Sequence, residues 1–281
     1  MPPRYYYTLS FRTEFLEQSK SYYFAYCFPY THSDLTAYLS GLTDEKTKCQ
    51  LVQRSLLCKT LGGHRVEMVT ITEPGTPQEL AKRKGVVITA RIHAGESNSS
   101  YVCKGVMDFL MGDNVEAQLL RKNFVFKIVP MINVDGVIHG NYRCSLSGID
   151  LNRVWKKPDA QLFPEIVAIK KMIEDFHSER SVVLFTDLHG HSRARKTFMY
   201  GNNYIHNPEY TRLFPYIFSK VEQDLFSYSK CRFSTEKSRE GTSRMAIWRL
   251  LRIPAVYTLE TSLCGSTPDS SAPHFSTDDL Q

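Results

Sequence analysis

The feature that most constrains this chain is the segment His93-Ala94-Gly95-Glu96, which follows an apolar run at residues 85–92. An imidazole and a carboxylate three residues apart, at the end of a predicted strand, can bind one metal ion because the glycine allows a tight turn. A second apolar run, at residues 181–185, leads to His189. Two histidines and one glutamate form the ligand set of a catalytic zinc, which leaves a fourth position for water. The fold must therefore bring the ends of two distant strands together.

From residue 33 onward the apolar pattern predicts strands that alternate with helices. Val102, Val106 and Phe109, for example, recur at helical spacing. Strands are expected at 55–60, 66–72, 85–92, 123–132, 182–187, 197–200 and 255–259. Helices are expected at 34–42, 99–111, 164–176, 208–228 and 243–251, and a further helix between 42 and about 55. Breaker-rich or polar loops are expected at 73–77 and from 133 to Trp155. This alternation predicts an α/β fold with a mixed central sheet and helices on both faces.

The N-terminal segment has a different pattern. Residues 5–11 and 21–28 are rich in aromatic and β-prone side chains, and polar residues 13–20 separate them. We therefore predict two strands of a hairpin before the α/β region.

Size and charge are compatible with one soluble domain. The chain has 281 residues, enough for one large α/β core or for one core plus a piece of another. Its net charge of +6 would favour acidic partners, although a solvated surface explains this modest excess equally well. Seven cysteines without Cys-x-x-Cys pairs indicate reduced thiols. No apolar run resembles a signal-peptide core or approaches membrane-spanning length. We expect a cytoplasmic protein with no membrane partner.

Further motifs give the metal-binding pattern a context that a lone His-x-x-Glu lacks. Gly-Asn-Tyr-Arg ends at Arg143, Asp-Leu-Asn-Arg spans residues 150–153, and Thr-Leu-Glu-Thr contains Glu260. In this order the motifs resemble those of the zinc carboxypeptidases. Asp-Leu-His-Gly-His-Ser at 187–192 and Leu-Glu-Thr-Ser at 259–262 resemble the cytosolic branch, which removes glutamates from tubulin and other proteins. The resemblance runs from about residue 34 to residue 265 and implies an α/β/α fold of that family.

The resemblance implies one zinc ion per chain, held by His93, Glu96 and His189. Glu260 is expected to take a proton from the attacking water and pass it to the leaving amine. Arg143 is expected to stabilise the oxyanion of the tetrahedral intermediate. For Glu260, a strand-end carboxylate paired with a nearby arginine is the alternative interpretation.

Three more residues are candidates for substrate binding. Asn152 and Arg153 can hold the C-terminal carboxylate of a peptide, because a planar guanidinium binds a carboxylate through two hydrogen bonds. The alternative is a surface turn in which Asp150 pairs with Arg153. Arg244 lies near the expected floor of the specificity pocket and would pair with a terminal glutamate. For His191 we favour a hydrogen-bonding role over metal binding, because another imidazole would close the metal site.

The resemblance also suggests a domain division. Residues 1–30 are expected to be the remnant of an N-terminal β-sandwich, and residues 31–281 a metallocarboxypeptidase catalytic domain. Residues 274–280 look like the cap and first turn of a helix. The C-terminal helix of related enzymes would then be missing, and we expect an exposed apolar sheet face and marginal stability.

The expected function is zinc-dependent release of C-terminal or side-chain-linked glutamates from proteins such as tubulin. The expected partners are acidic protein tails, such as polyglutamylated tubulin, bound by a monomer in the cytosol or at a microtubule, centriole or cilium. Two alternatives stay open: an aspartoacylase-like zinc amidohydrolase, and an inactive isoform that binds acidic tails.

Overall fold

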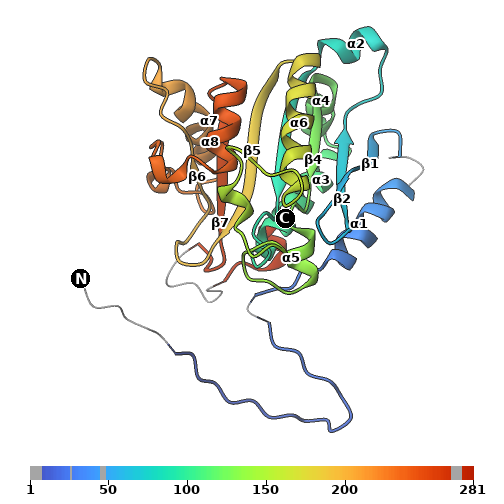
Figure 1. Cartoon of the computed structure of the whole chain (residues 1–281), viewed down its shortest axis with the longest axis vertical. Helices are drawn as coiled ribbons and strands as arrows, with labels where there is room; N and C mark the ends of the chain where they lie inside the picture. Colours follow the sequence, from blue (N-terminus) through green and yellow to red (C-terminus); the bar gives the residue numbers. More distant parts are fainter. Residues whose placement is uncertain (1–7, 26, 45–48, 267–273) are drawn as a thin grey trace.

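The computed structural model describes residues 8–25, 27–44, 49–266 and 274–281 (Figure 1). The strands are β1 (Val52–Lys59), β2 (Arg65–Ile71), β3 (Lys84–Ala90), β4 (Phe124–Val129), β5 (Val182–His191), β6 (Phe198–Tyr200) and β7 (Val256–Ser262). The α-helices are α1 (His32–Asp44), α2 (Pro77–Lys82), α3 (Ser97–Leu110), α4 (Val115–Asn123), α5 (Val134–Ile138), α6 (Pro164–Glu179), α7 (Pro208–Val221), α8 (Ser243–Leu251) and α9 (Thr277–Leu280). Short 3-10 helices lie at Leu151–Arg153, Tyr228–Lys230 and Lys237–Arg239.

Within the described residues, the strands form one mixed sheet in the order β1-β2-β4-β3-β5-β7-β6. The four inner strands β4, β3, β5 and β7 are parallel, and β1, β2 and β6 pair in antiparallel fashion at the two sides. Six of the seven β3 residues are buried, as expected for a parallel strand with helices on both faces. The predicted mixed α/β fold is therefore confirmed. Because β3, β5 and β7 run in the same direction, their carboxyl ends meet at one edge of the sheet.

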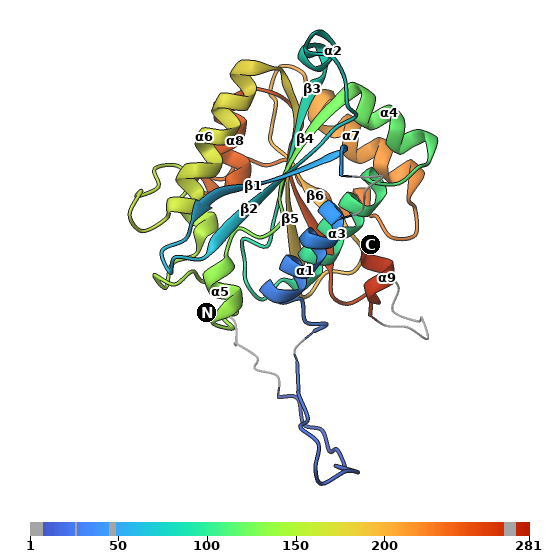
Figure 2. The ribbon, with the colours of Figure 1, turned by 90° about the vertical axis from the view of Figure 1, so that its right-hand side faces the viewer.

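Helices cover both faces of the sheet (Figure 2). α1, α3, α4 and α7 lie on one face, and α6 and α8 lie on the other. The strand and helix side chains between these layers form one continuous hydrophobic core, in which Trp155, Phe176 and Tyr257 are among the largest fully buried side chains. The expectation of an uncovered apolar sheet face is wrong, because the helices bury the inner strands. The exposed apolar side chains instead concentrate on α7 and in the segment 8–28.

The sequence pattern did not predict three helices, α2, α4 and α5, the last of which lies in the loop expected from residue 133. All three begin with side-chain caps, as α2 and α4 illustrate. Thr76 accepts a hydrogen bond from the Glu79 amide and forms a capping box with Glu79 at the start of α2. Asn114 accepts a hydrogen bond from the Ala117 amide at the start of α4, 2.7 Å long. Both helices are short, so their apolar periodicity is weak and the cap is the clearer signal.

Three local predictions are wrong. The helix expected at 208–228 ends at Val221, because the backbone of Glu222 is not helical. The expected helix up to residue 55 is not formed where the structure describes the chain, because β1 begins at Val52 and pairs with β2. The predicted hairpin strands are also absent from residues 8–25, 27 and 28, and residues 5–7 and 26 lie outside the described residues. Two features of the predicted hairpin are present in the described residues. They are a turn at residues 18–20 and a contact between the rings of Phe15 and Tyr22, whose centroids lie 4.7 Å apart. Two strands without a third strand or a helix to pack on are marginal in water. The β-sandwich assignment of residues 1–30 stays a prediction.

The C-terminal cap is formed as expected. Ser276 and Asp279 make a capping box at the first turn of α9, and Lys104 of α3 donates to the Gln281 side chain. No helix in the described parts of the chain is long and apolar enough to cross a membrane.

Glu165, in the first turn of α6, is a buried carboxylate whose Oε2 atom has no hydrogen-bond partner among the described residues. Burial raises the pKa of Glu165 to about 7, and the nearby carboxylate of Asp135 adds to the rise. Ionisation is therefore less favourable in the folded chain than in the unfolded chain, where the pKa is about 4.5. The resulting cost in stability is absent below pH ~4.5, grows as the pH rises to ~7, and is constant above that.

We predict that Glu165→Gln removes this pH-dependent cost. Relative to the unchanged protein, the variant should gain on the order of 2–3 kcal/mol in free energy of unfolding between pH 5 and pH 8. Urea unfolding at the two pH values measures this difference. Glu174→Gln, which changes an exposed carboxylate of the same helix, is the control and should show no such gain. A pH-independent difference for Glu165→Gln would contradict the prediction.

Candidate metal centre

The loop between β3 and α3 is held in an unusual conformation. Arg91 has a positive φ of 56°, which is rare for a residue with a side chain. Its buried guanidinium donates to the Ala94 carbonyl and to Ser100 Oγ, both at 2.9 Å. The Gly95 amide donates to the Tyr142 carbonyl at 2.7 Å, and a side chain at position 95 would collide with that carbonyl. These contacts fix His93 and Glu96 at the carboxyl end of β3.

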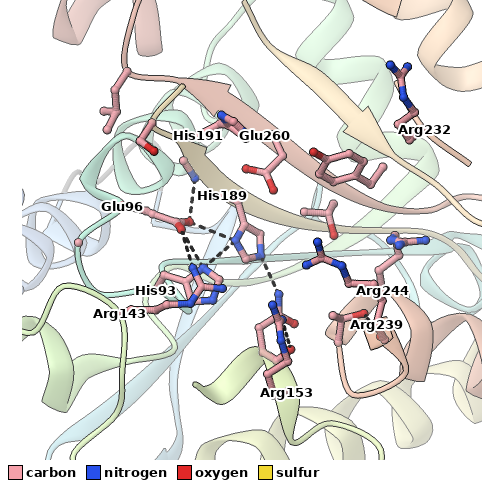
Figure 3. Close-up of a pocket in the computed structure, with 18 of the residues that line it drawn as sticks. His93, Glu96, Arg143, Arg153, His189, His191, Arg232, Arg239, Arg244 and Glu260 are labelled. Carbon is pink, nitrogen blue, oxygen red and sulfur yellow. Dashed lines mark hydrogen bonds and ion pairs between the residues drawn. The ribbon is translucent and has the colours of Figure 1, made fainter. Parts of the chain in front are cut away.

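His93, Glu96 and His189 converge at this edge of the sheet (Figure 3). The Nδ1 atoms of the two histidines lie 3.1 Å apart. Glu96 Oε1 lies 2.8 Å from His93 Nδ1, and Glu96 Oε2 lies 3.1 Å from His189 Nδ1. These separations are close to the ~3.3 Å between neighbouring ligands of a tetrahedral zinc with bonds of ~2.0–2.1 Å. The three side chains therefore fit a zinc ion.

The outer nitrogen of each imidazole faces a carboxylate. His93 Nε2 lies 3.0 Å from Asp150 Oδ1, and His189 Nε2 lies 3.0 Å from Asp187 Oδ2. Carboxylate–histidine pairs of this kind fix the ring orientation and tautomer of metal ligands. Both imidazoles therefore present Nδ1 to the same point.

Asp187 was missed by the sequence analysis as a functional residue. It is fully buried, and it accepts hydrogen bonds from Thr89 on β3 at 2.8 Å and from Ser243 on α8 at 2.5 Å. Its position two residues before His189 was a usable signal, because residues i and i+2 of a strand share a face.

The carboxylates determine the charge of the site. Burial opposes ionisation of Glu96, but hydrogen bonds from His189 and His93 outweigh it and hold the pKa of Glu96 well below its usual range. The pKa of Asp150 is likewise well below its usual range, because contacts with His93 and Arg143 outweigh burial. Burial would lower the pKa of His189, but the charges of Asp187 and Glu96 raise it well above its usual value. The site is therefore rich in negative charge, which a divalent cation would balance.

Glu260 lies on β7 directly beside His189 of β5 in the sheet register. Within the described residues its carboxylate makes no hydrogen bond or ion pair, which argues against the alternative of a structural salt bridge. Burial raises the pKa of Glu260 to about 7, with the carboxylate of Glu96 adding to the rise. A carboxyl group with this pKa, facing a pocket beside the metal ligands, is suited to proton transfer near neutral pH.

Arg143, Asn152 and Arg153 all line the same pocket as the metal ligands. Arg143 donates through Nε to Asp150 Oδ2 at 2.8 Å, and its NH1 lies 3.8 Å from Glu96 Oε1. Arg153 donates to the Asn152 carbonyl at 2.9 Å and lies 3.9 Å from Asp150. Asp150 and Arg153 therefore approach each other, as in the alternative of a surface turn. The turn lies in the pocket, however, and Asp150 also bonds to the imidazole of His93. The roles of these residues toward substrate stay predictions.

Arg244 also lines the pocket, from the first turn of α8. Its side chain is buried, and NH1 donates to the Gly201 carbonyl and to Asn202 Oδ1, the latter at 2.7 Å. Burial lowers the pKa of Arg244 to about 10, so the guanidinium is still charged at neutral pH. Arg244 is thus a fixed cation at the pocket wall.

Arg232 and Arg239 also line this pocket of about 520 Å³. Arg232 was not singled out from the sequence, whereas Arg239 was the substitute considered for Arg244, together with Lys237. His191 also lines it, but its Nδ1 accepts the backbone amides of Arg193 and Ala194 at 3.1 and 2.9 Å. His191 therefore has the hydrogen-bonding role favoured above, and its imidazole bonds to the backbone of the turn that follows it.

The family model described as zinc carboxypeptidase matches residues 36–280, and the chain belongs to this family. Cytosolic carboxypeptidase 3 of Mus musculus is 41% identical over 285 residues, which cover 99% of this chain and 28% of that protein. Cytosolic carboxypeptidase 2 of Macaca fascicularis is 44% identical over 281 residues, which cover 98% of this chain and 33% of that protein. The expected cytosolic branch is confirmed, and the chain spans about a third of the length of these relatives.

Solved structures show the same fold. A metallo-carboxypeptidase from Burkholderia cenocepacia superposes with a TM-score of 0.76 at 22% identity, covering 90% of this chain and 66% of that one. Carboxypeptidase A from Helicoverpa armigera gives 0.68 at 17% identity, covering 89% and 69%. Zinc is therefore the metal that the family implies for the His93, Glu96 and His189 site.

We predict that the purified protein binds about one zinc ion per chain and that His93→Ala loses most of it. Asp187→Asn keeps all three ligands but weakens the orientation of His189, so zinc affinity should fall about 10- to 100-fold. Competition with a zinc chelator measures the affinity. Asp175→Asn, on the outer face of α6, is the matched control. Unchanged zinc affinity in both His93→Ala and Asp187→Asn would place the metal elsewhere.

Proposed function

We propose that this chain is a zinc-dependent carboxypeptidase that releases C-terminal or side-chain-linked glutamates from acidic protein tails, with polyglutamylated tubulin as the expected substrate. The names of the cytosolic carboxypeptidases support the peptidase activity and a cytoplasmic location. Association with a microtubule, centriole or cilium would follow from that substrate. The proposal includes no nucleic-acid or membrane partner.

The observation that carries the proposal is the charge of the pocket beside the metal ligands. Five arginines line it, from separate parts of the chain: Arg143, Arg153, Arg232, Arg239 and Arg244. Its described lining residues include three carboxylates: the metal ligand Glu96, the catalytic candidate Glu260, and Glu236. The arginines therefore outnumber them. Guanidinium groups bind carboxylates through paired, charge-assisted hydrogen bonds. A peptide that ends in glutamate brings two carboxylates to this pocket.

The chain's own residues can perform the steps of hydrolysis. When bound, the zinc would supply a Lewis acid that polarises the scissile carbonyl and activates a water. Glu260 can accept the proton from that water and return it to the leaving amine, because it faces the pocket directly beside the metal ligand His189. Arg143 lies next to Glu96 and can stabilise the negative oxygen that develops. Arg153 and Asn152 can hold the terminal carboxylate, and Arg244 the glutamate side chain.

The aspartoacylase-like alternative loses support, because the matched family is the zinc carboxypeptidases over residues 36–280. The alternative of an inactive protein that binds acidic tails would use the same arginines but would not need Glu260. The following experiment distinguishes the carboxypeptidase from this tail-binding protein.

Glu260→Gln should keep the zinc and lose turnover by about 10²- to 10⁴-fold, because an amide cannot carry the proton. Release of free glutamate from a peptide ending in several glutamates measures turnover, and metal analysis of the same sample measures zinc. Glu236→Gln changes another carboxylate of the pocket and should retain turnover within a few-fold. Absence of glutamate release from the unchanged, zinc-loaded protein would favour the tail-binding alternative.

If Arg244 binds the glutamate side chain, Arg244→Gln should lower the preference for terminal glutamate over terminal leucine about ten- to a hundredfold. Glutamine is preferred to glutamate here, since a buried carboxylate beside the Gly201 carbonyl would destabilise the fold. Rates on peptides ending in Glu, Asp, Leu and Lys give the ratio. Arg249→Gln, five residues further along α8 and outside the pocket lining, is the control. An unchanged Glu-to-Leu ratio would exclude Arg244 and make Arg239 the next candidate.

A further inference from the structure

Helix α7 exposes a continuous apolar stripe. Thr211 and Pro215 point into the protein, where the Thr211 carbonyl accepts a hydrogen bond from the buried Tyr257 hydroxyl at 2.9 Å. Beside this buried side the helix carries large apolar side chains at helical spacing, with exposed fractions between 36% and 83%. These residues, here called the α7 stripe, are Tyr210, Leu213, Phe214, Ile217, Phe218 and Val221. Phe214 and Phe218 lie nearest the protein and also pack on the rings of Tyr257 and Phe226.

The area of the stripe is just sufficient for a weak, specific interface. Six side chains of ~150–250 Å² each, about half exposed, present on the order of 500–600 Å² of apolar surface. The largest apolar patch on an ordinary monomer covers about 300–600 Å², so the area of the stripe is at the upper end of that range. Two copies facing each other would bury roughly 1,000–1,200 Å², which reaches the lower range of specific interfaces. Figure 1 shows α7 at the outer side of the molecule, away from α1.

The charges beside the stripe are arranged for self-pairing. Glu209 and Lys220 are exposed, and neither makes an ion pair within the part of the chain that the structure describes. They lie 11 residues apart, which is just over three helical turns, so both occupy the same flank at opposite ends. Lys220 is held on this flank by the Tyr216 ring, 5.0 Å from its Nζ atom. The midpoint between Glu209 and Lys220 coincides with the middle of the α7 stripe.

We propose that the α7 stripe is the interface of a homodimer in which two α7 helices pack antiparallel about a two-fold axis. In this arrangement the apolar stripes face each other, and the shared flank places Glu209 of one copy opposite Lys220 of the other, twice per dimer. A parallel two-fold arrangement would instead place the two flanks on opposite sides of the interface, where Glu209 and Lys220 of the two copies could not pair. The dimer replaces the monomer expected from the sequence, and it does not depend on the proposed activity.

Sedimentation velocity of the full chain over a range from below one to about 100 µM measures the association constant. The unchanged protein should show a reversible monomer–dimer equilibrium. Ile217→Glu should weaken it by more than about 30-fold, because it places a charge in the middle of an apolar contact. Leu119→Glu, at an apolar position of α4 that is equally exposed, is the matched control and should leave the equilibrium unchanged. Zinc content and far-ultraviolet circular dichroism verify that each variant is folded.

The charge pairs test the antiparallel arrangement. Glu209→Lys and Lys220→Glu should each weaken self-association about three- to tenfold, because each creates two like-charge contacts. An equal mixture of the two variants should regain the affinity of the unchanged protein, since both contacts of the mixed dimer are then between opposite charges.

Three outcomes would overturn the proposal. A single monomeric species over the whole concentration range would show that another partner, or another part of a longer chain, covers the stripe. A dimer that Ile217→Glu does not weaken would place the interface elsewhere. No recovery in the mixture of the two charge variants would exclude the antiparallel two-fold pairing.

Discussion

The buried carboxylate of Asp187 joins the parts on which the site depends. It accepts hydrogen bonds from Thr89 on β3 and Ser243 on α8, and it faces His189 two residues further along β5. A carboxylate taken out of water is stable only if its oxygens are bonded and its charge is balanced. The sheet register of β3 with β5 and the position of α8 are therefore linked to the orientation of one metal ligand. A cation between the imidazoles would compensate the charge that this linkage requires.

The metal ligands could be predicted from the sequence because each follows a recognisable apolar run. His93 and Glu96 come after β3, His189 ends the next apolar strand with a suitable motif, and Glu260 lies within the last one. Parallel strands place such residues at one edge of the sheet whatever the details of packing. The carboxylates behind the histidines were harder to identify. Asp187 lies inside a strand, and Asp150 belongs to a turn motif, so their contacts with the imidazoles depend on tertiary structure.

The rest of the pocket shows the same limit. Arg232 and Arg239 lie far along the chain from His93, in segments without apolar periodicity, and only the path of the chain after β6 brings them to the metal ligands.

The secondary-structure prediction was wrong where the local preference of a segment and its tertiary context disagree. Residues 8–11 and 21–25 have strand-like composition but no partner strand, whereas Val52 begins a strand because β2 is there to pair with it. Short capped helices such as α4 were missed because their apolar pattern is too brief.

The hydrogen bond between the Gly95 amide and the Tyr142 carbonyl connects two loops with different roles. One loop carries His93 and Glu96, and the other carries Arg143. The contact is between backbones and admits no side chain at position 95, so a shift of either loop alone would break it. The order that a bound metal imposes on the first loop is therefore shared with the second, and the binding of metal and the binding of an anionic ligand at Arg143 are thermodynamically coupled. Each ligand should lower the entropic cost of the other, in equal measure in both directions.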